Sequence, residues 1–168
     1  MAYDPAPWQN FYVMSGGASA ALTGLLFVAM SLHAQTIMSN AFFRNRAITT
    51  LMSLTAQLLI SALVLIPGVA VTTLGLLVEA SALFFLGATI RAVMMLGPAS
   101  GAVPIARTRL AIELVGGAIW LVLFNAAGIS LLVRAGGGFY VLAAVMFVMF
   151  AWNIYVAWVL ITEVSERG

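Results

Sequence analysis

The sequence predicts an all-α integral membrane protein, a bundle of five transmembrane helices with its amino terminus outside and its carboxyl terminus in the cytoplasm. Of the 168 residues, 64% are hydrophobic and only 7% are charged, whereas a soluble domain has roughly 25% charged residues. Because so few charges cannot cover a water-exposed surface, we expect lipid to surround most of the protein. Glycine and proline turn signals divide the apolar sequence at intervals of about one bilayer crossing.

Each predicted span is an apolar run of about the length that a bilayer requires. In order, the spans are Phe11–His33, Ala47–Ile66, Val69–Leu96, Leu110–Val133 and Phe139–Thr162. The second ends at Pro67-Gly68, the third at Gly97-Pro98, and the fourth before the turn Ala135–Gly138. These segments occupy nearly the whole chain, so we expect one transmembrane domain over residues 1–168 and no soluble domain.

The arginine distribution supports five spans and sets the orientation. In this arrangement the amino terminus and the second and fourth connections share one side, which holds only Arg134. The opposite side holds the other arginines: Arg44, Arg46, Arg91, Arg107, Arg109 and Arg167. Positive residues accumulate on the cytoplasmic side of inner-membrane proteins. The sequence therefore predicts a multi-pass protein of the cell inner membrane with its carboxyl terminus inside.

Small residues line one face of the first span. Gly16, Ala20 and Gly24 are spaced at i, i+4 and i+8, with Gly17 and Ala21 beside them. Such a face lets a second helix approach closely where lipid provides no hydrophobic drive for association. The pattern predicts helix packing there, with a partner helix either in this chain or in another subunit.

Glu79 is the one acidic residue deep inside an apolar run. It lies about 11 residues beyond Pro67-Gly68, which at the helical rise is roughly 16 Å and close to mid-membrane. Its helix places Thr72, Gly75 and Ala82 on the same face. A carboxylate at this depth costs several kcal/mol of free energy unless it is protonated, paired with another group or bound to a ligand. We therefore expect this face of the helix to point away from lipid.

A polar stripe on the second span offers Glu79 a partner. Thr49, Ser53, Gln57 and Ser61 recur at i+4 spacing. Gln57 lies about as far before the turn as Glu79 lies after it, so an antiparallel hairpin predicts a Gln57–Glu79 hydrogen bond. Two interpretations follow. Glu79 is either a protonated structural group, or it binds a cation or proton together with Gln57, Ser53, Ser61 and Thr72.

The remaining polar residues suggest no catalytic chemistry. Asn125 and Asn153 lie inside the fourth and fifth spans and are expected to form interhelical hydrogen bonds. His33 is the only histidine and the chain has no cysteine, so we expect neither a metal nor another cofactor. No protease or hydrolase motif is present, and no basic cluster favours nucleic acid. The sequence predicts a protein that is not an enzyme.

The segment GGASAALTGLLFVAMSLHAQ, followed by Arg44-Asn45-Arg46 before the next span, resembles small polytopic inner-membrane proteins of bacteria, actinobacteria in particular. The resemblance covers the first two spans. It implies a bacterial inner-membrane location and carries no activity or site residue.

Two functions remain open at this point. The first is an oligomeric channel or small transporter subunit, in which polar stripes line a path and Glu79 binds the cation or proton. The second is a non-catalytic accessory subunit that packs against a larger membrane complex through the small-residue face of its first helix. The expected partners are the lipid bilayer and either further copies of the chain or another membrane subunit.

Overall fold

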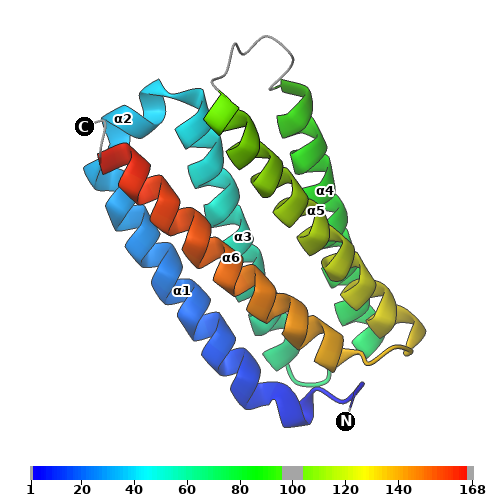
Figure 1. The fold of residues 1–168 in the computed structure, drawn as a ribbon. Coiled ribbons are helices and arrows are strands. Elements are labelled where there is room, and N and C mark those ends of the chain that lie inside the picture. The colour runs from blue at the N-terminus through cyan, green and yellow to red at the C-terminus, as the bar shows by residue number, and fades with distance from the viewer. Residues whose placement is uncertain (1, 96–103, 166–168) are drawn as a thin grey trace.

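The computed structural model describes residues 2–95 and 104–165, which are helical with no strand among them. The elements in order are η1 (Ala6–Trp8), α1 (Gln9–Leu32), α2 (Ala34–Ser39), α3 (Ala41–Leu65), α4 (Val71–Met95), α5 (Pro104–Val133) and α6 (Phe139–Ser165). The predicted all-α class is confirmed. The long helices run back and forth along a common direction, and the two termini lie at opposite ends of the bundle (Figure 1).

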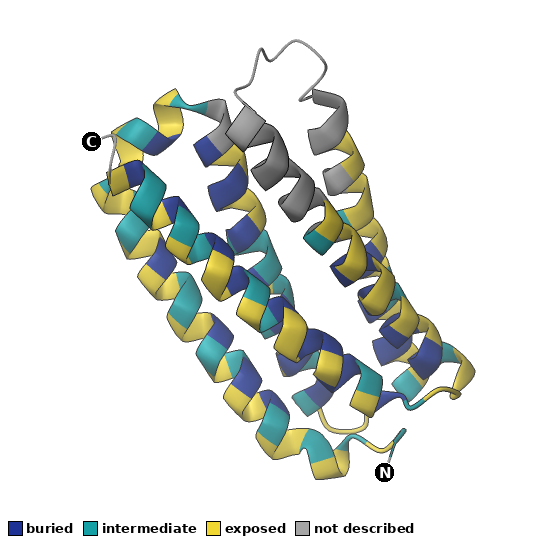
Figure 2. Ribbon diagram, viewed as in Figure 1, coloured by how far each residue is buried: buried dark blue, intermediate teal, exposed yellow. Residues whose placement is uncertain are grey.

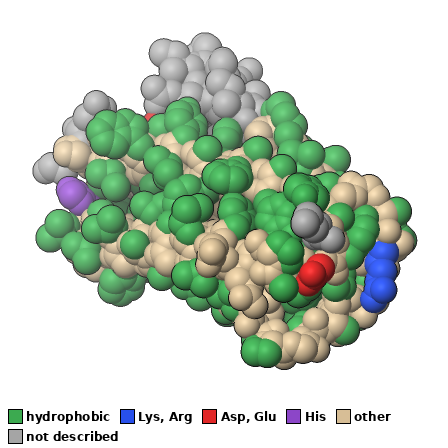
Figure 3. All heavy atoms as spheres, turned by 90° about the horizontal axis from the view of Figure 1, so that it is seen from below, with side chains coloured by type: hydrophobic (Ala, Val, Ile, Leu, Met, Phe, Trp, Pro, Cys, Tyr) green, Lys and Arg blue, Asp and Glu red, His purple; other side chains and the backbone are tan. Residues whose placement is uncertain are grey.

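The long helices differ in how well they suit a bilayer crossing. Three helical segments are long and apolar enough to cross a membrane, namely Ala6–Leu32, Phe43–Leu65 and Phe139–Ser165. Within the described residues, the apolar parts of α4 and α5 are shorter, Val71–Gly87 and Ala118–Val133. Figure 3 shows one face of the molecule, on which charged side chains occupy only small areas among hydrophobic and uncharged groups.

The helices form two groups. α1 packs mainly on α3, and both contact α6; α4 packs mainly on α5, which also contacts α6 (Figure 1). α3 and α4 are consecutive and are joined by a turn in which Gly68 has φ 76°, yet they touch each other much less. The fold is therefore a three-helix group, α1, α3 and α6, against which the α4–α5 hairpin rests.

Two helices begin earlier than the predicted spans. α3 begins at Ala41 and α5 at Pro104, and a proline fits a first helical turn because its missing N–H is not needed there. As a result Arg44 and Arg46 belong to α3 and not to a connection, which corrects the sequence prediction. The side chains of Arg107 and Arg109, and all of Arg167, lie outside the described residues.

Buried residues form one large hydrophobic core and one small one; Figure 2 marks the buried positions on the ribbon in dark blue. The large core includes Tyr12, Phe124, Leu142 and Met146 and joins all five long helices. The small core lies where α2 and the start of α3 meet the end of α6. Its buried members are Ile37, Phe43, Ala47, Leu160 and Val164.

The amino-terminal segment is held against the turn between α5 and α6. Phe139 N donates to Ala2 O (2.8 Å), and Gly137 N donates to the Tyr3 hydroxyl (3.0 Å). Gly138 has φ 52°, and a Cβ atom there would overlap the Ala2 carbonyl oxygen and the Tyr3 ring. The glycines of this turn therefore permit a close approach that a larger residue would block.

Candidate functional site at the α4–α5 interface

Glu79 lies on the face of α4 that packs against α5. On this face Ala82 is fully buried, and the Cβ of an alanine at Gly75 would lie only 3.0 Å from Leu132 N. The part of this face formed by Gly75 and Ala82 is thus turned toward α5, as its small residues predict, and Glu79 itself is half-buried.

The closest approach is between Glu79 and Gly128. A Cβ atom added to Gly128 would lie 2.5 Å from Glu79 Oε2, 3.1 Å from Glu79 N and 3.3 Å from Glu79 Cα. The backbones of α4 and α5 therefore nearly touch, and the carboxyl group lies against the glycine. Sequence reasoning did not assign Gly128 to the site, although a glycine within an apolar helix is a signal of close backbone approach.

Glu79 Oε2 is buried and has no hydrogen-bond partner among the described residues. Burying a polar group without a compensating hydrogen bond costs free energy, and the cost is far larger for an isolated charge. Binding of a proton or a cation at this oxygen would lower the cost, because either one offsets the negative charge. This carboxyl group is the chemically most distinctive feature of the α4–α5 interface.

The predicted hydrogen bond between Gln57 and Glu79 is wrong. Gln57 is fully buried, and both ends of its amide have other partners. Ser19 Oγ donates to Gln57 Oε1 (3.2 Å), and Gln57 Nε2 donates to Met146 O (2.7 Å). Helical rise predicted that Gln57 and Glu79 lie at similar distances from the α3–α4 turn. The two side chains nevertheless face different neighbours, because α3 turns its polar face toward α1 and α6, whereas α4 turns its acid toward α5.

Ser53 and Ser61 of α3 also face the three-helix group. Asn153 Nδ2 donates to Ser53 Oγ (3.0 Å), which joins α6 to α3. Ser61 is buried beside Gly16 of α1, with 3.0 Å between the Ser61 Cβ atom and a Cβ position on Gly16. Thr49 is exposed. The structure therefore separates Gln57, Ser53 and Ser61 from Glu79, with which the sequence grouped them.

Neither of two further candidates, Thr72 and Asn125, is hydrogen-bonded to Glu79 Oε2 among the described residues. Thr72, near the start of α4, is exposed. Asn125 is half-buried on α5, and its Nδ2 donates to Leu121 O in the same helix (2.7 Å). Asn125 lies one turn before Gly128, on the helix that packs against Glu79.

The small-residue face of α1 divides into two parts. Gly16 contacts Ser61 on α3, as described above. The rest of the face is open, because Gly17, Ala20, Ala21 and Gly24 are exposed, and no atom lies within 4 Å of a Cβ position on Gly17 or Gly24. The packing that the sequence predicts inside the chain therefore involves one edge of this face.

An ion pair at the opposite end of the three-helix group was not foreseen. Arg46 Nη1 lies 3.6 Å from Glu163 Oε2, and the two side chains are 6% and 17% exposed. The Arg46 carbonyl oxygen also accepts the hydroxyls of Thr49 (3.0 Å) and Thr50 (2.8 Å). The predicted topology could have suggested this ion pair, because it puts the start of the second span and the end of the fifth on the same side of the membrane.

The described residues contain no group of three or more His, Cys, Asp or Glu side chains placed to hold a metal ion. No model of a known protein family matches the chain, and searches of curated proteins and of solved structures return no match.

Proposed function

We propose that this protein is a small inner-membrane channel or transporter subunit in which Glu79 binds the proton or cation that is moved. The proposal includes five transmembrane helices, with the amino terminus outside, because the arginines of the chain concentrate on one side of such an arrangement. Copies of the chain would assemble as an oligomer in the bilayer.

The observation that carries the proposal is the carboxyl group of Glu79. It lies in an apolar helix and presses against the backbone of Gly128, and its Oε2 atom is buried without a hydrogen-bond partner among the described residues. Ionisable groups inside membrane helices commonly mark ion pathways and proton relays. Placing such a group in a bilayer costs free energy, so proteins seldom keep one there unless it has a function.

The distribution of polar contacts supports a division of roles between the two helix groups. Hydrogen bonds of Gln57 and Asn153 tie α1, α3 and α6 to one another. The α4–α5 hairpin carries Glu79 and contacts the three-helix group mainly between α5 and α6, and less between α4 and α3. In our proposal the three-helix group is the scaffold, and the hairpin brings the carboxyl group to either side of the membrane barrier.

Flux measurements on proteoliposomes test this proposal. Glu79→Gln keeps the size and the hydrogen-bonding capacity of the side chain but removes its ability to exchange a proton or balance a cation. We expect the variant to lose proton or cation flux, whereas the matched variant Ser81→Ala on the same helix keeps it, because the Ser81 hydroxyl is bonded only within α4 (Leu77 O, 2.8 Å). Equal flux in wild type and Glu79→Gln would refute the role of Glu79.

The open face of α1 favours a second candidate function. Gly17, Ala20, Ala21 and Gly24 form a small-residue surface that is exposed to the surroundings, and such surfaces let helices associate in membranes. A non-catalytic accessory subunit would use this surface to pack against a helix of a larger membrane complex.

Native mass spectrometry of gently solubilised membranes separates the two candidates. A channel subunit should appear as a homo-oligomer, whereas an accessory subunit should appear in fixed stoichiometry with a different protein. In the second case Gly17→Leu should release the partner, because the larger side chain blocks close helix approach. The control is Val13→Leu, at an exposed position of α1 that is already occupied by a large side chain.

A further inference from the structure

The groups around Glu79 Oε2 bear on which ion this carboxyl can hold. Mg²⁺ and Ca²⁺ take about six to eight oxygen ligands, and Na⁺ or K⁺ is held in membrane proteins by several carbonyl oxygens. A proton needs only the carboxyl oxygen to which it bonds, and the resulting O–H group can donate one hydrogen bond. A metal cation and a proton therefore place different demands on the surroundings of the carboxyl group.

The backbone beside Glu79 is regular helix on both sides of the interface. α4 is continuous from Val71 to Met95 and α5 from Pro104 to Val133. The carbonyl oxygens around Glu79 and Gly128 therefore accept hydrogen bonds within their own helices. Membrane transporters that bind Na⁺ use carbonyls from segments where a helix is unwound. Because both helices are continuous here, their backbone does not supply the ligands that Na⁺ requires.

The hydroxyl groups nearest to Glu79 and Gly128 along the chain are engaged elsewhere. Ser81 Oγ donates to Leu77 O (2.8 Å) within α4, and two residues along a helix turn a side chain away from the previous face. Ser130 Oγ donates to Ala135 O and accepts from Gly138 N (2.9 Å). Within the described parts of both helices, these hydroxyls therefore do not complete a shell of oxygen ligands around Oε2.

One side-chain oxygen, that of the Asn125 amide, is placed on the correct face of α5. Asn125 lies three residues before Gly128 and so shares the face that packs against Glu79. Its amide nitrogen donates to Leu121 O (2.7 Å), which leaves the amide oxygen as an acceptor. One such oxygen can accept a hydrogen bond from a protonated carboxyl group, but it is too few for the ligand shell of a metal cation.

We propose that the ion bound at Glu79 is a proton and not a metal cation. On the side of Gly128 the space beside Oε2 is already filled, because an added methyl carbon would lie only 2.5 Å from that oxygen. Bonding a proton removes the charge of the carboxylate without requiring space for a second ion and its ligands. This inference rests on the proposed function, because it names the species that the same carboxyl group carries.

Charged side chains on the elements around Glu79 belong to positions near helix ends. They are Arg91 on α4, Arg44 and Arg46 on α3, and Arg134 just after α5. Arg91 and Arg134 are exposed; Arg91 is about 18 Å of helix from Glu79, and Arg134 is about 9 Å beyond Gly128. Arg46 is paired with Glu163. The side chains of Arg107, Arg109 and Glu113, near the start of α5, lie outside the described residues.

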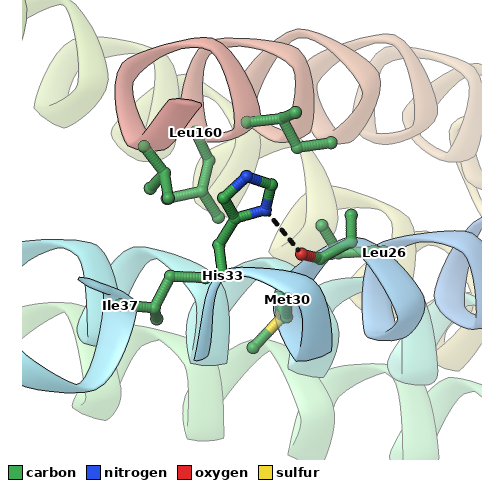
Figure 4. Close-up of a pocket in the computed structure, with 8 residues that line it drawn as sticks. Leu26, Met30, His33, Ile37 and Leu160 are labelled. Atoms are coloured by element: carbon green, nitrogen blue, oxygen red, sulfur yellow. Dashed lines mark hydrogen bonds between the residues drawn. The ribbon is translucent and has the colours of Figure 1, made fainter. Parts of the chain in front are cut away.

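His33, the only histidine, belongs to a different part of the molecule. Figure 4 shows its ring pointing from the end of α1 toward α6, in a pocket with room for about one water molecule. Its Nδ1 lies 3.2 Å from Ala29 O. Because His33 lies in the three-helix group and Glu79 in the α4–α5 hairpin, single variants can separate their titrations.

Infrared spectroscopy of the full-length protein in lipid nanodiscs tests the assignment. A protonated carboxyl group has a C=O band distinct from the bands of a carboxylate, so the difference between wild type and Glu79→Gln isolates this side chain. We expect the band of the protonated acid at low pH, falling about tenfold for each pH unit above the midpoint of its titration. Replacing choline by Na⁺, K⁺ or Mg²⁺ at the same ionic strength should leave the band unchanged.

Binding of a metal cation would give a different infrared result. At the titration midpoint, a cation at ten times its dissociation constant would lower the band about sixfold by competing with the proton. Such a loss would overturn the inference. A Glu79 carboxyl group that stays ionised, or stays protonated, at every pH would overturn it too, because neither state exchanges a proton. Gly87→Ala is the matched control and should titrate as wild type does, since nothing lies within 4 Å of a Cβ position there.

Flux measurements in proteoliposomes separate this inference from the proposed function. With choline as the only other cation we expect proton flux to persist, with the same pH profile in His33→Gln. If the band titrates as expected but Glu79→Gln leaves flux unchanged, Glu79 binds a proton and the proposed function is wrong. If flux depends on Glu79 but requires Na⁺ or K⁺, the proposed function stands and the assignment of a proton is wrong.

Discussion

Replacing Gly128 with alanine tests the contact on which the candidate site depends. The new methyl carbon would lie 2.5 Å from Glu79 Oε2 and 3.1 Å from Glu79 N. Carbon atoms normally approach other heavy atoms no closer than about 3.5 Å. The carboxyl oxygen can move aside by rotation, but the backbone nitrogen moves only if the two helices separate by a few tenths of an ångström.

The expected cost follows from this geometry. Overpacking a well-packed interior destabilises a protein by about 1–3 kcal/mol. We therefore expect Gly128→Ala to lower the free energy of unfolding by about 1–3 kcal/mol. In a Glu79→Ala background the methyl group no longer meets the carboxyl oxygen, so part of the cost should disappear, with a coupling of about 1 kcal/mol. The backbone contribution should remain in both backgrounds.

The assay is unfolding of the purified protein in mixed micelles, followed by the change in helix content. Two other glycines of the hairpin serve as controls. Gly75→Ala meets Leu132 at 2.9 Å in the same interface, so it should destabilise equally in both backgrounds and show no coupling to Glu79. Gly87→Ala has nothing within 4 Å and should be neutral or slightly stabilising, since alanine is a better helix former than glycine.

A specific outcome would refute the reasoning. If Gly128→Ala is as stable as wild type, or if its cost is the same with Glu79 and with Ala at position 79, the carboxyl group does not lie against Gly128. The register between α4 and α5 would then differ from the one described, and the burial of Glu79 Oε2 against Gly128 would have to be abandoned.

Three further predictions concern the scaffold. Gln57→Met keeps the side-chain volume but removes both amide hydrogen bonds, so it should destabilise the protein by about 1–2 kcal/mol in the same unfolding assay, with no extra effect when combined with Gly128→Ala. Glu163→Gln removes the carboxylate that lies 3.6 Å from the mostly buried Arg46 guanidinium, and it should lower stability by about 3 kcal/mol. The expected readout is a lower melting temperature in detergent, and a melting temperature equal to that of wild type would contradict the ion pair. Gly138→Ala should cost more than about 1 kcal/mol, because its φ is positive and the methyl group would overlap the Ala2 carbonyl, and rapid proteolysis of the amino terminus should accompany it.

Much of the helical structure is readable from local sequence. The turn at Pro67-Gly68 ends α3, and the glycines before Phe139 adopt positive φ between α5 and α6. The exceptions are the starts of α3 and α5, which both lie before the predicted spans. At the start of α3, Arg44 and Arg46 suggested a connection. Charged residues are expelled from the bilayer centre but not from helices, so a charge pattern marks the membrane boundary better than the helix boundary.

The sequence was a less complete guide to which neighbour each helix face contacts. The small residues around Glu79 indicated a face turned away from lipid, and α5 covers that face. On α1 the same kind of pattern was a weaker guide, because Gly16 packs against Ser61 while Gly17 and Gly24 remain open. Small residues permit close approach on any side where they occur, but they do not attract a helix to that side.

The sequence by itself determined that the protein is helical, that three of its helices are long and apolar enough to cross a membrane, and that Gln57 and Glu79 lie at similar distances from their shared turn. These properties follow from hydropathy, turn residues and the fixed rise of a helix. Only the tertiary structure decided which helix each polar side chain faces. Gln57 bonds to Ser19 and Met146, and Glu79 lies against Gly128. The reason is that helical rise sets depth, whereas rotation about the helix axis and the choice of neighbour come from the packing of all the helices together.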